Sequence, residues 1–433
     1  MEVGAGCGAL TGLFCQKVSK VTAVEGTDRR AQIIYNRHKN HHNLEISLGN
    51  INDMEFEEKF DYIVLCDVLE YASQFTQTDN PYSDFLKKIK TMLSEDGVIL
   101  LAIENRLGLK YFSGSNEDHL GQSFLGIDDY PNINHVRTFS RFELEELIQD
   151  AGFSEYKFFY PYPDHKFPVI IHTDEFVDEL PFLKDSPNFG YEKIKFFDEG
   201  SLNVALAKDN ISKFFANSFL VEIRNSDIFH ESEKVKYCKL GNFRGEEFRI
   251  GTKILKVNDD LIVSKFPLNQ KAVKHMEKMY LHSKRTFGKI RCLEGVFEDN
   301  ILYYPYLKEL DLSQVVTNLL VKDSDKKEVI EIFKKIYDSL KFNSIENDSY
   351  HDDQFSEVLG EKRINGPLHC HEVSNIDLIL NNLFIIDNEI VAIDYEWCYD
   401  FPIPIEFIFW RIISFEKNDN QVFKKFITVE ENF

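Results

Sequence analysis

The sequence lacks basic residues relative to acidic ones: 50 Lys and Arg stand against 72 Asp and Glu, which gives a formal net charge of −22. A field of this sign repels the phosphates of nucleic acids and anionic membranes, so neither is an expected partner. The seven cysteines form no C-x-x-C pair, which argues against a disulfide framework or structural zinc site and favours a reducing, cytoplasmic location. Because no run of about 18 apolar residues occurs and residues 1–4 show no signal segment, we expect no membrane span and no secretion.

What the sequence does contain is an alternation of strand and helix patterns. Its 433 residues, 43% of them hydrophobic, are enough for two or three domains with buried cores. Short β-branched runs at 21–24, 62–65 and 98–103 predict strands, and apolar residues at helical spacing in 29–39 and 83–93 predict the helices between them. This order is typical of an α/β domain built on a parallel sheet.

The rest of the chain divides into an insertion, a linker and a second half. Residues 105–168 are rich in Gly, Asn, Asp, His and Tyr, a composition typical of an insertion that carries a pocket. The polar stretch 224–236 is the best candidate linker, so we place two domains at 1–225 and 226–433. Further elements are expected as a turn at 95–97, helices at 142–151 and 270–287, strands at 203–207, 218–223, 248–257 and 261–266, and hairpins at 295–306 and 379–393.

The motif E-x-G-x-G-x-G at residues 2–8 is the most informative stretch of the chain. Glycines spaced by two let backbone N–H groups approach a ligand without an intervening Cβ, and the helix start that follows offers the positive end of a dipole. Residues 4–9 also fit, loosely, the dinucleotide fingerprint G-x-G-x-x-A, with an acid at Glu25 about 20 residues on. The motif alone therefore leaves a nicotinamide cofactor and S-adenosylmethionine both open.

The surroundings of this motif resemble class I methyltransferases, which use S-adenosylmethionine. By this resemblance Glu2 holds the methionine end of the cofactor, and Glu25 accepts hydrogen bonds from both ribose hydroxyls. Residues 49–53 and 60–67 are similar to the third loop and fourth strand of the same fold. The cofactor site that the resemblance implies consists of Glu2, Gly4, Ala5, Gly6, Gly8, Glu25, Asn50, Ile51 and Cys66. The plain alternative is a tight strand-to-helix turn that binds nothing.

The runs AIENRLGLKYF at 102–112, EDH at 117–119 and YPYPDHKFP at 160–168 resemble a group of bacterial methyltransferases found with surface-polysaccharide synthesis. This resemblance covers about residues 1–225 and implies methylation of a sugar hydroxyl. We take His119 as the candidate general base because the unperturbed pKa of histidine lies near working pH, with Asp67 at the end of the fourth strand as the second candidate. An equally weighted interpretation is that His119 only anchors the insertion by hydrogen bonds.

In the second half, Asp377-x4-Asn382, a short hairpin and then Asp394 have the spacing of a phosphotransferase site. The three residues would be a catalytic carboxylate, a metal-binding amide and a metal-binding carboxylate. The arrangement resembles the choline kinase and aminoglycoside phosphotransferase group, whose fold is two-lobed and protein-kinase-like. That resemblance implies Lys265 as the strand lysine that pairs with phosphates and Glu277 as its ion-pair partner.

Two positions depart from that family. Asn375 stands where a histidine is usual, and Gly251 is the one glycine near the place of a glycine-rich loop. The sequence is therefore compatible with two interpretations: a working metal and nucleotide site, or a kinase fold that no longer transfers phosphate. The order of the two halves resembles bifunctional enzymes that terminate O-antigen polysaccharides by phosphorylation and methylation. Those enzymes carry a coiled-coil tail, whereas no heptads follow Trp410.

We therefore expect a Rossmann-like class I methyltransferase sheet followed by a protein-kinase-like, two-lobed domain. The expected ligands are S-adenosylmethionine, a glycan or sugar precursor, and ATP with Mg2+ at the second site, and the expected partners are polysaccharide-synthesis enzymes. Two rival classes are a catalytically inactive scaffold that keeps both folds and a nicotinamide-dependent sugar oxidoreductase. Because only residues 1–3 are left to form the first strand, we also expect that a segment is missing ahead of the glycine loop.

Overall fold

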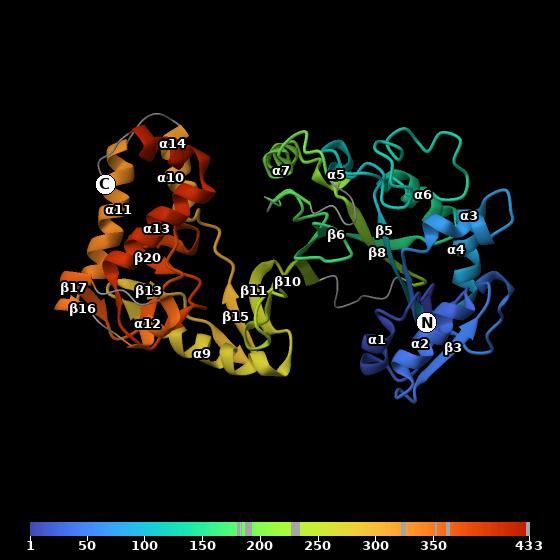
Figure 1. Cartoon of the computed structure of the whole chain (residues 1–433), viewed down its shortest axis with the longest axis horizontal. Helices are drawn as coiled ribbons and strands as arrows, with labels where there is room; N and C mark the ends of the chain where they lie inside the picture. Colours follow the sequence, from blue (N-terminus) through green and yellow to red (C-terminus); the bar gives the residue numbers. More distant parts are fainter. Residues whose placement is uncertain are drawn as a thin grey trace. The chain divides into compact units, whose positions relative to one another are not determined.

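The computed structural model describes residues 1–179, 182, 184–186, 193–226, 234–321, 326–350, 353–360 and 364–429. The chain divides into two compact units, unit 1 at Met1–Leu240 and unit 2 at Gly241–Phe433 (Figure 1). The division falls at the end of strand β9. Part of the predicted linker, residues 227–233, lies outside the described residues.

Unit 1 is built on a mixed sheet with the strand order β9-β7-β6-β8-β5-β4-β1-β2-β3. Neighbouring strands from β3 to β5 run parallel, and those from β5 to β9 pair antiparallel. The strands are β1 (Glu2–Val3), β2 (Val21–Glu25), β3 (Leu44–Leu48), β4 (Phe60–Cys66), β5 (Leu93–Glu104), β6 (Glu155–Tyr162), β7 (Ile170–Thr173), β8 (Ser218–Arg224) and β9 (Val235–Leu240). The carboxyl ends of β1, β2 and β4 therefore meet at one edge, where open sheets of this kind bind ligands.

Helices cover both faces of the parallel strands. Phe85 of α4 and Leu144 of α6 share a core cluster with Leu65 of β4. Ile34 of α2 packs with Ala23 of β2 in a second cluster. The helical segments of unit 1 are α1 (Thr11–Lys17), α2 (Asp28–His38), η1 (Ile51–Asp53), η2 (Leu69–Tyr71), α3 (Ala72–Phe75), α4 (Pro81–Met92), α5 (Leu109–Phe112), α6 (Arg141–Asp150), α7 (Glu199–Lys208) and α8 (Ser212–Phe215).

Two predicted elements of unit 1 are wrong, while β2, β4, β5, β8, α2, α4 and α6 are confirmed to within a few residues. The turn expected at 95–97 lies inside β5, where the pairing with β4 shifts register between Phe60 and Tyr62. The strand expected at 203–207 belongs to helix α7. Its first turn is capped by Asp198, whose carboxylate accepts from the N–H of Ser201, and this cap together with helix-forming Ala and Leu outweighs the β-branched Val204.

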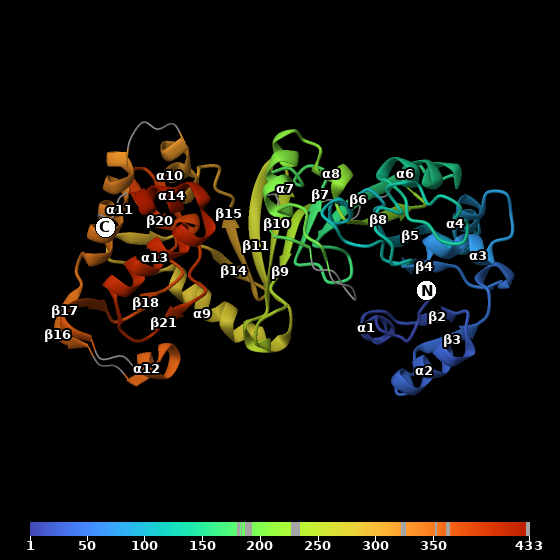
Figure 2. The same ribbon diagram turned by 45° about the horizontal axis from the view of Figure 1, so that its top comes forward.

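Unit 2 contains an antiparallel sheet with the order β14-β15-β11-β10, and helix α9 contacts three of its strands (Figure 2). Smaller sheets have the orders β12-β13-β20-β19, β16-β17-β22 and β18-β21. The strands are β10 (Ile250–Val257), β11 (Asp260–Pro267), β12 (Thr286–Phe287), β13 (Ile290–Cys292), β14 (Val296–Glu298), β15 (Ile301–Pro305), β16 (Ile345–Tyr350), β17 (Ile364–His371), β18 (Ser374–Asn375), β19 (Leu383–Ile386), β20 (Glu389–Ala392), β21 (Cys398–Tyr399) and β22 (Ile403–Pro404).

The helices of unit 2 gather around one hydrophobic core. Phe333 of α11, Ile412 of α13 and Phe423 of α14 belong to the same buried cluster. The helical segments are η4 (Glu246–Phe248), η5 (Gln270–Ala272), α9 (Val273–Ser283), α10 (Leu312–Val321), α11 (Lys326–Lys341), α12 (Asp353–Leu359), η6 (Leu380–Asn382), α13 (Ile405–Asp419) and α14 (Gln421–Val429). The helix predicted at 270–287 is thus shorter, because β12 begins at Thr286.

Both hairpins predicted in unit 2 are confirmed. Strands β14 and β15 pair antiparallel, and so do β19 and β20. The turn between β19 and β20 is Asp387-Asn388, with φ of 51° and 65°. Asp and Asn tolerate this left-handed conformation better than most residues, so the dipeptide suits the turn of the predicted hairpin.

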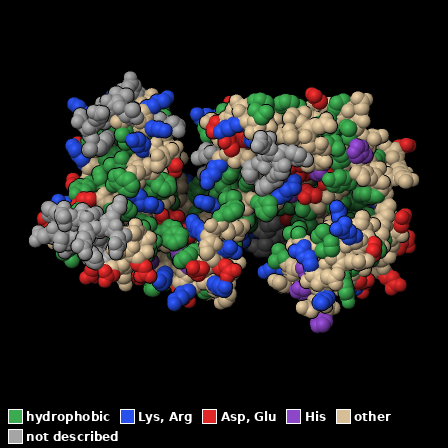
Figure 3. Space-filling view, in the orientation of Figure 1, with side chains coloured by type: hydrophobic (Ala, Val, Ile, Leu, Met, Phe, Trp, Pro, Cys, Tyr) green, Lys and Arg blue, Asp and Glu red, His purple; other side chains and the backbone are tan. Residues whose placement is uncertain are grey.

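The surface carries charges of both signs. On the face shown in Figure 3, acidic and basic side chains are interspersed over each unit. Within the described part of the chain, no two cysteines form a disulfide bond. None of the helices in the described ranges is both long enough and apolar enough to cross a membrane.

Candidate functional site

The glycine loop begins directly after β1, at the edge where the parallel strands end. Gly4 has a φ of +67°, and a Cβ added there would lie 2.6 Å from Cγ2 of Val68. Gly6 also has a positive φ, and its N–H donates to Oε2 of Glu25 at 2.9 Å. Gly8 lies away from the cavity described below, and its carbonyl accepts from Nε2 of His38 at 2.7 Å. A side chain at Gly4 would therefore clash with Val68, and a side chain at either Gly4 or Gly6 would strain the backbone.

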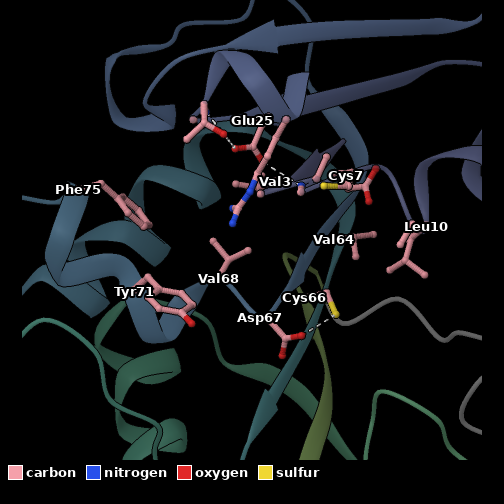
Figure 4. Close-up of a pocket in the computed structure, with 18 of the residues that line it drawn as sticks. Val3, Cys7, Leu10, Glu25, Val64, Cys66, Asp67, Val68, Tyr71 and Phe75 are labelled. Carbon is pink, nitrogen blue, oxygen red and sulfur yellow. Dashed lines mark hydrogen bonds between the residues drawn. The ribbon is translucent and has the colours of Figure 1, made fainter. Parts of the chain in front are cut away.

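Glu25, the last residue of β2, holds this loop through its carboxylate. Besides the bond from Gly6, its Oε1 accepts from the backbone N–H of Thr27 at 3.0 Å and from the Thr27 hydroxyl at 2.9 Å. The side chain is buried but lines the cavity (Figure 4). Because a carboxylate has about four lone-pair sites, Glu25 can accept further hydrogen bonds from a ligand in the cavity.

A cavity of about 920 Å³ opens beside the loop and extends to the end of β4. Among its lining residues are Glu2, Gly4, Ala5, Gly6, Glu25, Cys66, Asp67, Val68, Tyr71, Phe75, His165 and Lys166. Burial raises the pKa of Glu2, partly offset by a hydrogen bond of 2.5 Å that its Oε2 accepts from the Thr11 hydroxyl. The predicted residues Glu2, Gly4, Ala5, Gly6, Glu25 and Cys66 therefore meet at this cavity.

A smaller cavity of about 240 Å³ adjoins the first one through shared lining residues such as Gly4 and Val68. Asn50 and Ile51, both predicted as cofactor residues, line it together with Phe75. The Asn50 amide is occupied locally, because its Nδ2 donates to the carbonyl of Phe75 at 2.9 Å. The surface that lines the small cavity is therefore largely apolar, and it suits a flat ring system.

The other end of the large cavity is formed by Cys66 and Asp67, where β4 ends. Asp67 has a φ of +54°, and its Oδ1 accepts from Nε2 of His165 at 2.7 Å. Cys66 Sγ lies 4.0 Å from Oδ2 of Asp67, and burial raises the pKa of this thiol to about 12, so it stays protonated. Figure 4 shows Glu25 and Asp67 on opposite sides of the cavity, with Val68 between them.

His165 and Lys166 are cavity residues to which the sequence analysis assigned no role. They follow β6, and the backbone N–H of His165 donates to Oγ of Ser218 on β8 at 2.8 Å. Lys166 forms an ion pair with Oε1 of Glu104. The signal was the dense run of polar residues at 160–168, but a run does not indicate which side chain will face the cavity.

His119 lies outside the cavity lining, behind Tyr71. Its Nδ1 lies 2.8 Å from the Tyr71 hydroxyl, and its Nε2 lies 3.3 Å from Oε2 of Glu104. Burial lowers the pKa of His119, but the carboxylates of Glu104 and Glu70 outweigh it and raise that pKa to about 9. The structure therefore brings Asp67, but not His119, to the cavity.

In unit 2 the predicted residues Asp377, Asn382, Asp394 and Lys265 come together. Lys265 on β11 donates to Oδ1 of Asp394 at 2.8 Å, and Asn382 donates through Nδ2 to the carbonyl of Asp377 at 2.9 Å. Burial, followed by the charges of Asp394 and Glu396, raises the pKa of Asp377 to about 7. Burial lowers the pKa of Lys265, but Asp394 outweighs this and raises it to about 12.

Two residues of unit 2 differ from their expected places. Glu277 on α9 is exposed, and the ion-pair partner of Lys265 is Asp394 instead. Asn375, which replaces the usual histidine, is fully buried; its Oδ1 accepts from the N–H of Asp377 at 2.8 Å and its Nδ2 donates to the carbonyl of Asp394 at 3.1 Å. Asn375 thus links the segments that carry Asp377 and Asp394. These segments remain connected although the usual histidine is absent.

Comparison with protein families finds a match for part of unit 1. Residues 1–156 match the model of a methyltransferase domain. An uncharacterised methyltransferase from Staphylococcus carnosus (strain TM300) is 32% identical over 152 residues, which cover 35% of this chain and 68% of that protein.

Solved structures that resemble the chain are also methyltransferases. A candidate O-methyltransferase from Nostoc punctiforme PCC 73102 gives a TM-score of 0.28 at 15% identity over 37% of this chain, which spans 47% of that protein. The N-methyltransferase NodS from Bradyrhizobium japonicum WM9, in complex with S-adenosyl-L-homocysteine, gives a TM-score of 0.29 at 13% identity, covering 52% of this chain and 76% of that one.

Proposed function

The chain belongs to the methyltransferases, because its first 156 residues form a class I S-adenosylmethionine-dependent domain. From this we propose that it methylates a hydroxyl group of a cell-surface glycan or of its sugar precursor. The observation that carries the proposal is the Glu25 carboxylate, which lies beside the glycine loop at one side of a cavity whose other side holds Asp67. The activity would take place in the cytoplasm, in association with polysaccharide-synthesis enzymes.

The residues around the cavity fit S-adenosylmethionine. Gly6 and Thr27 occupy three of the roughly four lone-pair sites of Glu25, which leaves one for a ribose hydroxyl, and the small cavity lined by Ile51 and Phe75 suits the adenine ring. Glu2 lines the cavity, and we assign the methionine end of the cofactor to it. When bound, this cofactor supplies an electrophilic methyl group on a sulfonium.

Asp67 is the residue we assign to the acceptor hydroxyl. Its Oδ1 is held by His165 at 2.7 Å, which orients the carboxylate and leaves Oδ2 to accept the hydroxyl proton. Asp67 would take the proton that the acceptor hydroxyl loses when it is methylated. His119 does not line the cavity, so it cannot act on the acceptor directly and serves instead to position Tyr71.

Cofactor binding is tested by calorimetric titration of the chain with S-adenosylhomocysteine. We expect micromolar affinity for the wild type and a loss of at least tenfold in Glu25→Ala, because the ribose contact and the hydrogen bond that holds the loop at Gly6 both disappear. Glu45→Ala is the matched control, since it removes an exposed carboxylate from the neighbouring strand β3. If the folded wild type gives no heat, or if Glu25→Ala binds as well as the wild type, the rival scaffold interpretation is favoured.

The acceptor is tested by transfer of a labelled methyl group to nucleotide-activated hexoses and soluble hexose oligosaccharides. With an acceptor found, we expect Asp67→Asn to lower kcat by about 100-fold or more while leaving S-adenosylhomocysteine affinity intact. His119→Gln would lower kcat much less. Equal losses in both variants would contradict the assignment of Asp67, and a nicotinamide-type absorbance of bound cofactor would favour an oxidoreductase.

For unit 2 we propose a kinase-like phosphotransferase site that binds ATP and Mg2+. The supporting observation is that Lys265, Asp377 and Asp394 converge, with Asn382 beside them. Asn382 and Asp394 are the metal ligands in this proposal, Lys265 pairs with phosphates, and Asp377 is the catalytic carboxylate.

Binding of a fluorescent ATP analogue with Mg2+ tests this second site. We expect Lys265→Ala to weaken binding at least tenfold, whereas Lys256→Ala, an exposed lysine of the adjacent strand β10, changes it little. Absence of nucleotide binding by the folded wild type would leave unit 2 as a kinase-like fold without phosphate transfer.

A further inference from the structure

Three buried side chains behind Tyr71 form a group outside the methyl-transfer cavity. Glu70 lies on η2, Glu104 is the last residue of β5, and His119 comes from the insertion that follows β5. One donor atom from each lies within 4.8 Å of the other two. Glu70 and Glu104 are 0% exposed, so bulk water does not solvate their carboxylates.

Within the described part of the chain, neither carboxylate oxygen of Glu70 makes a hydrogen bond. Oε2 of Glu104 and Nε2 of His119 face the same space and lie 3.3 Å apart as an ion pair. Buried carboxylates in native proteins are almost always paired, because an unpaired buried charge costs several kcal/mol. A fully buried carboxylate without a partner, which faces Glu104 and His119 at this distance, therefore points to a cation among the three side chains.

We propose that Glu70, Glu104 and His119 bind a divalent first-row transition-metal ion. Two carboxylates and one imidazole form a mixed oxygen and nitrogen donor set, which Mn2+, Fe2+ and Zn2+ accept. The hydroxyl of Tyr71, 2.8 Å from Nδ1 of His119, fixes the ring and leaves Nε2 facing the carboxylates. Metal-binding histidines are commonly oriented in this way through their second nitrogen.

The neighbouring charges leave room for the ion. Lys166 pairs with Oε1 of Glu104, so Oε2 is the oxygen that faces His119, while Glu117 accepts from the backbone N–H of His119 at 2.9 Å and holds that segment in place. A second group, Cys66 with Asp67 and His165, has comparable spacing, but its carboxylate is not a buried group without a partner, because Asp67 accepts from His165 and its side chain is 34% exposed. The first group is therefore the better site.

The ion would act as a positioning element. Glu70, Glu104 and His119 do not line the cavity, whereas their partners Tyr71 and Lys166 do. A metal ion at this place would join the ends of β4 and β5 to the insertion and so fix the wall of the cavity that faces the acceptor. Ion binding can be measured without any acceptor or methyl transfer, so this inference stands independently of the proposed function.

The test uses the full chain, free of tags and treated with a chelator, titrated with Mn2+ and followed by the electron paramagnetic resonance signal of the free ion. We expect one Mn2+ per chain, with affinity weakened at least tenfold in Glu70→Gln and in Glu104→Gln. His165→Gln, from the rival group, should bind Mn2+ like the wild type. In thermal unfolding, Mn2+ should raise the Tm of the wild type but not of Glu70→Gln, which keeps the side-chain volume and removes an unpartnered charge.

Three results would overturn the inference. The first is that the folded wild type binds neither Mn2+ nor Zn2+ at millimolar concentration. The second is that Glu70→Gln and Glu104→Gln bind as tightly as the wild type, which would indicate surface histidines such as His41 and His42. The third is that His165→Gln alone loses the ion. Circular dichroism of each variant without metal separates a lost site from a lost fold.

Discussion

Gly4 is the residue on which the shape of the cofactor loop depends most. Its φ of +67° is costly for a residue with a Cβ, by about 1–2 kcal/mol, and a Cβ would also lie 2.6 Å from Cγ2 of Val68. The backbone strain and the clash with Val68 would both move the loop from its native position. Because Gly4 lines both cavities, we expect Gly4→Ala to weaken S-adenosylhomocysteine binding at least tenfold by calorimetry.

A double variant separates the two effects. Val68→Ala removes the methyl group that would clash, so Gly4→Ala with Val68→Ala should recover part of the lost affinity when compared with Val68→Ala alone. The backbone strain would account for the remainder. Unchanged affinity in Gly4→Ala would contradict the role assigned to the loop.

Strand β7 carries a buried histidine whose charge state is linked to the stability of unit 1. His172 is 0% exposed and its ring contacts those of Tyr162 and Tyr237. Burial lowers the pKa of His172 to about 4, more than the backbone contact with Phe176 raises it. The folded state therefore holds this ring neutral, and its contribution to the free energy of unfolding is complete above pH about 6.5 and is lost as the pH falls toward 4.

The pH dependence of urea unfolding tests this linkage. Between pH 7 and pH 4, His172 should cost wild-type unit 1 up to about 3 kcal/mol, a loss that His172→Phe, which retains an aromatic ring, should avoid. His42→Gln, at an exposed position, is the control and should lose stability as the wild type does. An identical pH dependence in the wild type and His172→Phe would contradict the effect of burial.

Local sequence signals predicted the elements that depend on local interactions. The glycine loop, Glu25 and the strands β2, β4 and β5 follow from spacing and β-branched composition within a few residues. Helix α7 was misassigned because a short run of apolar residues suits a buried strand as well as a helix, and the Asp198 cap favours the helix.

The parts of the site that escaped prediction depend on long-range contacts. His165 meets Asp67 across 98 residues of sequence, because β6 and β8 continue the sheet beyond β5. His119 was predicted as a base, yet the side chains of Glu104 and Tyr71 hold both of its nitrogens behind the cavity wall. Neither contact is associated with a periodic pattern in the sequence, so both could be identified only from the structure.

The two units have separate hydrophobic cores, and this bears on how the chain unfolds. The core clusters of unit 1 contain residues of Met1–Leu240 alone, and the large cluster of unit 2 contains residues of Gly241–Phe433 alone. A unit with its own core can unfold as its own cooperative transition. A ligand stabilises only the unit that binds it, by about 2.7 kcal/mol at a concentration of 100 times Kd.

Differential scanning calorimetry with each ligand therefore assigns the sites to the units. S-adenosylhomocysteine at 100 times Kd should raise the Tm of one transition by about 5–10 °C and leave the other in place, since 1 kcal/mol corresponds to about 2–4 °C for a unit of this size. ATP with Mg2+ should raise the other transition, and Glu25→Ala should abolish the first shift alone. If S-adenosylhomocysteine moved both transitions equally, the units would unfold as one cooperative body, and the separation of their cores would not govern stability.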